Sequence, residues 1–396
     1  MKDLLLMLRR AYRLDNWRGR ILLGFTILLA LLIVMRIVLT PSIIYATTSW
    51  LKGQGVDAHI EDIEIRIIDS RVSLIEARGE KDGKPLFHIG KVHVDWHWTP
   101  LSNKTISVTG IELEALKADI ALYEDMAIVG GLRIPLGKAD VENDSSTAQE
   151  QNDEPVKPWA AELGTVTFKQ LELCYLQHHS TLQDASAENR FVDYCLKVDD
   201  LAWQGMIGYG LDAGLAEKDP VPVMIKGDFD ISGINIIDNR IGRALLVSDA
   251  NSIDGFDING LNDIRISTLT MQGLSALQRD DDEHKDAVRY SRVTLNDIRF
   301  TDLNSLDVAR IEVDEPGLYI VKDTENDWEY QQWVPASKSG ETADDNSKQQ
   351  QSDKEATRFA LTLHDIRVTA PDMCYLDKPQ DLYYCFTQQS LDWQGE

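Results

Sequence analysis

The 396-residue sequence has few cysteines and few basic residues for its length. Only four cysteines occur, and 40 lysines and arginines stand against 65 aspartates and glutamates, which gives a net charge of −25. A nucleic-acid-binding protein needs a basic footprint, and this chain has the opposite charge. Glycine-rich phosphate loops followed by lysine and Gly-x-Ser-x-Gly elbows are both absent from the sequence. We therefore predict no nucleic-acid partner, no cofactor and no enzymatic activity.

The sharpest pattern of metal-ligand types is His93-x-Asp95-x-His97, with His88 nearby. Two histidines two apart on a strand share a face and can bind one metal ion. The stretch aligned with it in the second half of the chain, Val293–Asp297, has no histidine. His93, Asp95 and His97 also fall on the polar face of their strand, where histidines are common. We therefore predict no metal site there.

Two weaker patterns are also assigned to ordinary structure. Cys174 is followed by His178 and His179, but the corresponding Cys374 has no histidines after it, so a disulfide is the better reading. The alternating carboxylates of Asp323 to Asp327 resemble a calcium loop but lack its glycine and its distal glutamate. This segment is predicted to be an acidic turn.

A long apolar run lies near the N-terminus. Ile21 to Leu39 is apolar except for Gly24, Thr26 and Arg36, and as a helix it would extend about 28 Å, close to one hydrocarbon thickness. Six basic and two acidic residues precede it in positions 1–20. Because basic flanks stay in the cytoplasm, we predict a cytoplasmic segment 1–20, a transmembrane anchor 21–40 and an exported remainder. The alternative, a cleaved signal peptide, has a shorter apolar run and a small-x-small cleavage site.

The exported part reads as two copies of one unit. Residue n matches residue n + 200 over a long stretch, and a ten-residue deletion then changes the offset to 190. The matches include Ile111–Glu114 with Ile311–Asp314, Cys174–Leu176 with Cys374–Leu376, Tyr194-Cys195 with Tyr384-Cys385, and Trp203–Gly205 with Trp393–Gly395. Four cysteines allow three pairings. The repeat selects Cys174 with Cys195 and Cys374 with Cys385, because each pair then recurs within one copy.

Each copy contains a polar, low-complexity stretch at the same place, which we predict to be a disordered loop. The resulting division is repeat 1 over 41–205 with loop 139–157, a β connecting segment over 206–257, and repeat 2 over 258–396 with loop 337–357. Repeat 2 stops just after its Trp-Gln-Gly, so it is expected to be incomplete. Its last strand would leave an unpaired edge, so we expect either that the chain is a fragment of a longer protein or that a partner covers this edge.

Alternation of apolar and polar residues dominates both copies and predicts strands with one apolar face. About 20 strands at a spacing of about 4.8 Å would form a sheet of roughly 100 Å. The alternation by itself is compatible with two architectures. The strands form either closed sandwiches or barrels, or one long curled sheet. Helical signal outside the anchor is sparse, with short helices predicted over Ser42–Lys52 and Arg240–Val247.

The order of these features resembles a known family. The chain resembles the AsmA-like proteins of Gram-negative bacteria. The resemblance lies in the order of a basic N-terminus, one membrane span, the segment Ile43 to Val56, the run Ile60–Ile65 and the strand Val108–Leu113. The AsmA-like proteins belong to the repeating β-groove superfamily that includes TamB. The resemblance covers residues 15–200 well and the second copy more loosely. The paired cysteines are not a general feature of that family.

The resemblance implies a mostly β fold, in which an inner-membrane anchor precedes a long curled antiparallel sheet that forms an open periplasmic groove. It implies phospholipid transport between the inner and outer membranes, with phospholipid and the inner membrane as partners. The unpaired last strand, rather than the resemblance, is the reason to expect an envelope protein at the C-terminal edge. The alternative is a non-catalytic scaffold for outer-membrane or envelope assembly. The groove residues predicted to contact lipid are Val92, Val94, Trp96, Val166, Phe168, Val221, Val223, Leu361 and Leu363.

Overall fold

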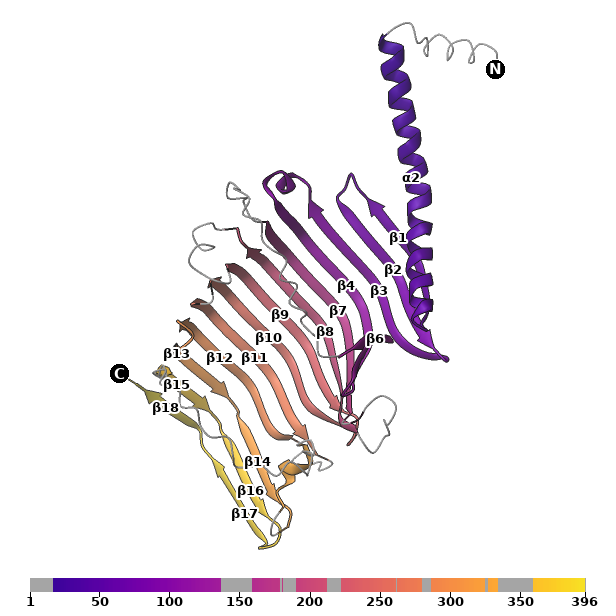
Figure 1. The fold of residues 1–396 in the computed structure, drawn as a ribbon. Coiled ribbons are helices and arrows are strands. Elements are labelled where there is room, and N and C mark those ends of the chain that lie inside the picture. The colour runs from indigo at the N-terminus through magenta and orange to yellow at the C-terminus, as the bar shows by residue number, and fades with distance from the viewer. Residues whose placement is uncertain are drawn as a thin grey trace, which may run out of the picture.

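The computed structural model describes residues 17–136, 159–178, 180, 190–211, 222–260, 262–279, 286–324, 327–333 and 359–395. One long helix precedes a single 18-stranded sheet (Figure 1). The first half comprises α2 (Trp17–Gly53), β1 (Asp57–Arg66), β2 (Arg71–Lys81), β3 (Lys84–His97), η1 (Thr99–Asn103), β4 (Thr105–Leu122), β5 (Met126–Val129), β6 (Leu132–Pro135), β7 (Ala160–His178) and β8 (Arg190–Tyr209). The second comprises β9 (Val223–Asp238), β10 (Arg243–Asn259), β11 (Asp263–Gln278), β12 (Asp286–Thr301), β13 (Ser305–Asp314), β14 (Gly317–Lys322), η3 (Glu329–Trp333), β15 (Ala360–Thr369), β16 (Asp372–Asp377), β17 (Leu382–Thr387) and β18 (Ser390–Gln394).

The sheet is open, so of the two architectures left by the sequence the long curled sheet is the observed one. Across its middle, thirteen strands lie in the order β1, β2, β3, β4, β7, β8, β9, β10, β11, β12, β13, β15 and β18. Twelve intervals of about 4.8 Å make this stack about 58 Å long. The predicted 100 Å was too long, because 13 rather than about 20 strands form the stack. β5 and β6 pair only at the end of β4, and β14, β16 and β17 continue β13, β15 and β18.

The prediction of a purely antiparallel sheet is wrong, because the sheet is mixed. Three strand pairs are parallel, namely β4 with β7, β13 with β15 and β14 with β16. Parallel neighbours need a crossover connection of a dozen or more residues. The segments between Pro135 and Ala160 and between Lys322 and Ala360 meet that need. The predicted loops 139–157 and 337–357 lie in these segments, outside the described residues.

The parallel pairs repeat at the offset seen in the sequence. Thr105 pairs with Ala160, and Ser305 pairs with Ala360 in the same register. The disulfides are the two predicted pairs, Cys174–Cys195 and Cys374–Cys385, and each links two directly opposite residues of neighbouring strands.

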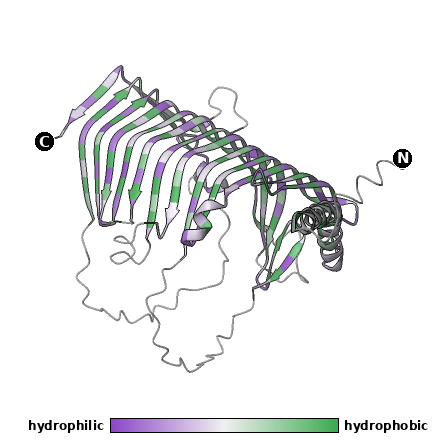
Figure 2. Ribbon diagram, turned by 90° about the horizontal axis from the view of Figure 1, so that it is seen from above, coloured by the Kyte–Doolittle hydropathy of each residue, from purple (hydrophilic) through white to green (hydrophobic). Residues whose placement is uncertain are grey.

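The strands are bent, and the sheet curves about a concave side (Figure 2). Residues of positive φ recur at matching positions on several of the strands. Such residues follow one line across the sheet at Glu76, Ala115, Gln170, Gly233, Gly273, Glu315 and Ala370. Glycine is required at two of these positions, because Asp199 and Asp249 on the next strands leave no room for a Cβ.

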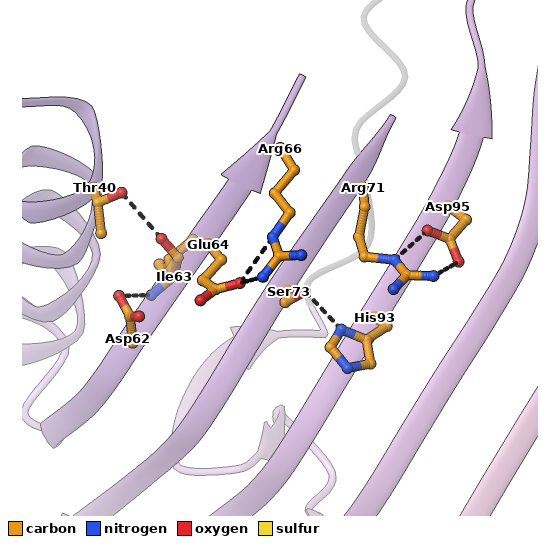
Figure 3. A network of polar contacts seen from close by, with 9 residues as sticks. All are labelled: Thr40, Asp62, Ile63, Glu64, Arg66, Arg71, Ser73, His93 and Asp95. Atoms are coloured by element: carbon orange, nitrogen blue, oxygen red, sulfur yellow. Dashed lines mark hydrogen bonds and ion pairs between the residues drawn. The ribbon is translucent and has the colours of Figure 1, made fainter. Parts of the chain in front are cut away.

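Helix α2 lies along β1 at one end of the sheet (Figure 1). Thr40 Oγ1 donates a hydrogen bond of 3.0 Å to the carbonyl oxygen of Ile63 in the middle of β1 (Figure 3). Val56, where the chain turns from α2 into β1, is fully buried. A helix over an edge strand blocks pairing with another chain. This end of the sheet is therefore covered.

The two helices predicted outside the anchor had different outcomes. Ser42–Lys52 is helical, but as part of α2, which continues through Pro41 although proline lacks the N–H for one helical hydrogen bond. Arg240–Val247 is not a helix. The Asp238 carboxylate accepts bonds from the Arg240 backbone N–H and guanidinium, which fixes a hairpin turn, and β10 begins at Arg243.

Among the residues that the structure describes, no helix is both long enough and apolar enough to cross a bilayer. The predicted anchor 21–40 falls within α2, where the side chains at 22–23 and 28–37 lie outside the described set.

Candidate functional site

Two rows of apolar side chains cross the sheet on one face. Residues directly opposite each other on paired strands share a face, so a row can be followed from strand to strand. The Val94 row consists of Ile65, Val72, Val94, Ile111, Val166, Trp203, Phe229, Ile253, Leu269, Leu295, Ile311, Ile366 and Trp393. All thirteen strands contribute an apolar residue.

The second row runs two residues away along each strand and therefore lies on the same face. This Val92 row consists of Ile63, Leu74, Val92, Leu113, Phe168, Leu201, Ile231, Asn251, Met271, Val293, Val313, Val368 and Leu391. Asn251 is its single polar member. The two rows together form the apolar band.

The residues between these rows point to the opposite face, and nearly all are polar. This His93 row consists of Glu64, Ser73, His93, Glu112, Thr167, Ala202, Asp230, Ser252, Thr270, Thr294, Glu312, Arg367 and Asp392. Ala202 is the single apolar member. The sheet thus has one apolar and one polar face over its whole length.

Several members of the apolar band are buried although the sheet is a single layer. Val166, Val293 and Trp203 are each less than 10% exposed. Among the described elements, only α2, η1 and η3 are not strands. Burial without a second layer shows that neighbouring side chains within the sheet cover one another at these positions.

Two lines of broken pairing flank the apolar band. In the pairing of β4 with β7, Ala115 and Gln170 are left without a partner on one side of the band, and Thr109 and Gly164 are left without a partner on the other. Apolar residues continue beyond each line after a step of three rather than two, as in Val108 to Ile111 and Leu113 to Leu116. The residue left unpaired on each strand explains this step, because it shifts the alternation by one.

The predicted groove residues fall into three groups. Val92, Val94, Val166 and Phe168 lie in the apolar band. Trp96, Leu361, Leu363 and Val223 lie on strands of the same sheet, opposite Val108, Leu306, Val308 and Tyr209. Val221 lies outside the described residues.

Sequence reasoning missed most of the band. The omitted members include Trp203, Phe229, Leu269, Leu295, Ile311 and Ile366. A recurring signal marks them, namely two apolar residues at i and i + 2 with a three-residue step to the next apolar residue. This signal marks where the alternation shifts by one residue.

On the polar face, opposite charges are paired across strands. Arg71 and Asp95 are directly opposite and form two hydrogen bonds of 2.6 and 2.9 Å (Figure 3). Lys117 with Glu172, Arg310 with Asp365 and Arg367 with Asp392 repeat this arrangement at 3.1, 3.0 and 2.8 Å. These pairs hold neighbouring strands together on the solvated side.

The histidine pattern makes ordinary contacts. His93 Nδ1 is 2.6 Å from Ser73 Oγ (Figure 3), Asp95 is bound by Arg71, and His88 Nε2 is 3.1 Å from Glu76. Within the described ranges, no cluster of three or more metal-ligating side chains occurs. His178 stacks on Tyr123 with ring centroids 5.0 Å apart, and His179 lies outside the described residues.

The Arg71–Asp95 pair predicts a pH-dependent contribution to stability. The hydrogen bond from Arg71 holds the pKa of Asp95 below its ordinary value. A depressed pKa in the folded state stabilises the protein above the unfolded pKa of about 3.9, and this contribution is lost as the pH falls through the folded pKa. Because the pair is partly exposed, Asp95→Asn should lower the free energy of unfolding by less than about 1 kcal/mol at pH 7.

Urea denaturation at pH 7 and at pH 3 measures this effect. The difference between wild type and Asp95→Asn should shrink at pH 3, and Arg71→Gln should follow the same pattern. An equal difference at both pH values would show that the ion pair is not its cause.

Comparison of the sequence with protein-family models and with curated protein sequences finds no match.

Proposed function

We propose that this chain is an inner-membrane-anchored periplasmic protein whose apolar band carries phospholipid acyl chains between the inner and outer membranes, as its resemblance to AsmA-like proteins implies. The observation that carries the proposal is the unbroken Val94 row, which crosses thirteen strands from Ile65 to Trp393. An apolar path that connects the two ends of a molecule suits a long apolar cargo that must move along it.

The energetics favour acyl chains as the cargo. Removing hydrocarbon from water contributes about 0.8 kcal/mol per CH₂, and the band offers aliphatic and aromatic partners on every strand. The polar face keeps the other side of the sheet in water, and the charge of −25 opposes aggregation. No catalytic group is needed for this task, so the proposal is for a non-enzymatic carrier.

The sequence and helix α2 support the proposed membrane anchor and the proposed periplasmic location. The run Ile21–Leu39 has the composition of a span, and the basic residues before it favour a cytoplasmic N-terminus. Ile21, Phe25 and Ile27 of α2 are exposed large apolar side chains, which a bilayer would cover. Two disulfides fit an oxidising compartment such as the periplasm. Because α2 lies against β1, the apolar band would begin beside the inner membrane.

Photo-crosslinking in intact cells tests contact with lipid. A photoreactive residue at Val94 or Val166, in the apolar band, should capture phospholipid. The matched controls are His93 and Thr165, the preceding residues in the same strands, whose side chains point to the polar face and should capture little. Because each control residue is adjacent to its test residue, the two variants should have similar expression and the probe lies at nearly the same position along the strand.

The alternative is a scaffold that assists envelope assembly without touching lipid. It predicts that probes at Val94 and Val166 capture protein or nothing. Equal lipid capture at His93 and Val94 would also count against the proposal, because it would report on general proximity to a membrane rather than on the apolar band.

A further inference from the structure

The turns that join β1 to β2 and β3 to β4 carry large apolar side chains that are exposed. These residues, which we call the apolar tip, are Ile67, Ile68, Trp98 and Leu101. Ile68 is 98% exposed. The segment Lys81–Lys84, which turns β2 into β3 at the other end of the same strands, has no apolar residue except its glycine. The exposed apolar residues of these turns therefore gather at one end of the first strands.

Hydrogen bonds and a ring contact hold the two turns together. Trp98 Nε1 donates a hydrogen bond of 3.2 Å to the carbonyl oxygen of Ile67. The backbone N–H of Trp96 donates to the carbonyl oxygen of Ser70 at 3.0 Å. The rings of Trp96 and Trp98 meet edge to face with their centroids 5.4 Å apart. The two turns therefore present the apolar tip as one unit.

The position of the apolar tip is fixed by the packing of α2 along β1. The two elements run side by side in opposite directions (Figure 1). From Gly53 back to Thr40 the helix covers thirteen residues, or about 20 Å, and from Asp57 to Ile63 the strand covers six residues, also about 20 Å. The hydrogen bond from Thr40 to Ile63 agrees with this register. The tip thus lies on the side toward which the helix enters its apolar run.

The same register limits how far the tip reaches along the helix. Ile67 is four residues beyond Ile63, which is about 13 Å along a strand and equals about nine helical residues. The tip therefore reaches at most the level of about residue 31 of α2, within the apolar run Ile21–Leu39. Figure 1 shows β1 leaning away from α2 toward its end, so the actual reach is shorter.

Charged residues limit the depth to which the tip enters a bilayer. Arg66 and Arg71 stand at the base of the first turn and form ion pairs with Glu64 and Asp95 at 2.8 and 2.6 Å (Figure 3). Asp69 lies in the turn itself. A charge in hydrocarbon is costly, whereas charged and tryptophan side chains are accommodated at the headgroup level. The tip is therefore suited to shallow insertion.

We propose that the apolar tip inserts into the periplasmic leaflet of the inner membrane, at the level of the phospholipid headgroups and the first acyl carbons. This inference rests on the membrane anchor of the proposed function and adds a second membrane contact to it. A bilayer fits the tip better than a protein partner, because the tip lies at the level of the apolar run that the same bilayer would cover.

The second contact has a use in lipid transfer. Two contacts fix the orientation of the sheet on the membrane, which one helix alone does not. Ile65, the first residue of the Val94 row, lies two residues before Ile67. An acyl chain that leaves the bilayer beside the tip therefore meets the beginning of the apolar band.

Depth-dependent fluorescence quenching tests the insertion. The four cysteines of the chain all form disulfides, so one added cysteine can be labelled with a fluorophore. The full chain carrying Ile68→Cys, Asp82→Cys or Phe25→Cys is reconstituted into liposomes of phosphatidylethanolamine and phosphatidylglycerol. The liposomes contain phospholipid with a spin label near the headgroup end or near the methyl end of one acyl chain.

The label positions separate the tip, the opposite turn and the anchor. The probe at Ile68 should be quenched, and more strongly by the spin label near the headgroup end. The probe at Asp82, in the opposite turn, should not be quenched by either lipid. The probe at Phe25, an exposed residue of α2, should be quenched because it lies in the proposed anchor.

A pair of double variants tests whether the apolar side chains hold the tip in the bilayer. With the probe moved to Leu101→Cys, Ile67→Ser/Ile68→Ser should lower quenching at least about twofold, because two apolar side chains no longer favour burial in lipid. Asp82→Ser/Lys84→Ser is the matched control in the opposite turn and should leave quenching unchanged. All four substituted residues are exposed, so neither variant removes a packed side chain.

Three results would overturn the inference. The first is quenching at Phe25 without quenching at Ile68, which would place the anchor in the bilayer and the tip in water. The second is stronger quenching at Ile68 by the label near the methyl end, and the third is unchanged quenching at Leu101 in Ile67→Ser/Ile68→Ser. Absence of quenching at Phe25 would instead overturn the proposed anchor, which distinguishes that failure from failure of the tip.

Discussion

Val166→Glu is expected to block movement of lipid along the apolar band while the protein stays folded. Val166 is 9% exposed and lies between Ile111 and Trp203, directly opposite both. An unpaired charge in an apolar setting costs a few kcal/mol. Lipid capture by a photoreactive residue at Leu295, farther from α2, should therefore fall at least tenfold, since about 1.4 kcal/mol corresponds to a factor of ten.

Thr165→Glu is the matched control, with the same charge one residue away on the polar face. It should leave capture at Leu295 unchanged. Formation of the Cys174–Cys195 disulfide and the amount of protein report on folding. If Val166→Glu leaves capture unchanged as well, the band is not the lipid path.

Removal of the Cys174–Cys195 disulfide is expected to have the largest effect on stability. It joins β7 to β8 in the interior of the stack, across a sequence separation of 21 residues. A loop of this size contributes about 3 kcal/mol through the entropy of the unfolded chain. The double variant Cys174→Ser/Cys195→Ser should therefore lose about that much free energy of unfolding in urea denaturation followed by tryptophan fluorescence.

The second disulfide gives a matched comparison. Cys374–Cys385 has a sequence separation of 11 residues but joins the edge strand β17, which pairs only with β16 among the described strands. Its removal should speed hydrogen exchange in β17 and leave the rest of the sheet largely unchanged, because each strand depends on its neighbours. A similar loss of global stability in both double variants would contradict this view.

The sequence predicted the class of fold and the disulfides because both depend on local or repeated patterns. Alternation such as Val92 and Val94 around His93 reports directly on the two faces of a strand. The cysteine pairs followed from the repeat, which restricts each cysteine to a partner in its own copy. These features require no knowledge of which strands are neighbours.

Features that depend on neighbours could not be predicted in the same way. The parallel pairing of β4 with β7 requires knowledge of where the chain goes after Pro135. The apolar residues around Arg240–Val247 fit one helical turn as well as a strand, and the Asp238–Arg240 contact decides between them. Ala115 and Gln170 have positive φ, although neither residue type carries a signal for that conformation. The sequence therefore predicted only some of the residues of the apolar band.

The order of pairing has a consequence for how the chain folds. Most neighbours in the sheet are consecutive in sequence, so each can form by closing a short loop. The pairs β4–β7 and β13–β15 instead join residues such as Thr105 and Ala160 or Ser305 and Ala360, which are 55 positions apart. Closing a longer loop costs more entropy before any contact forms, and folding slows as contacts become less local. A chain that emerges N-terminus first would thus assemble outward from α2 in two fast bursts, each followed by a pause at a parallel step.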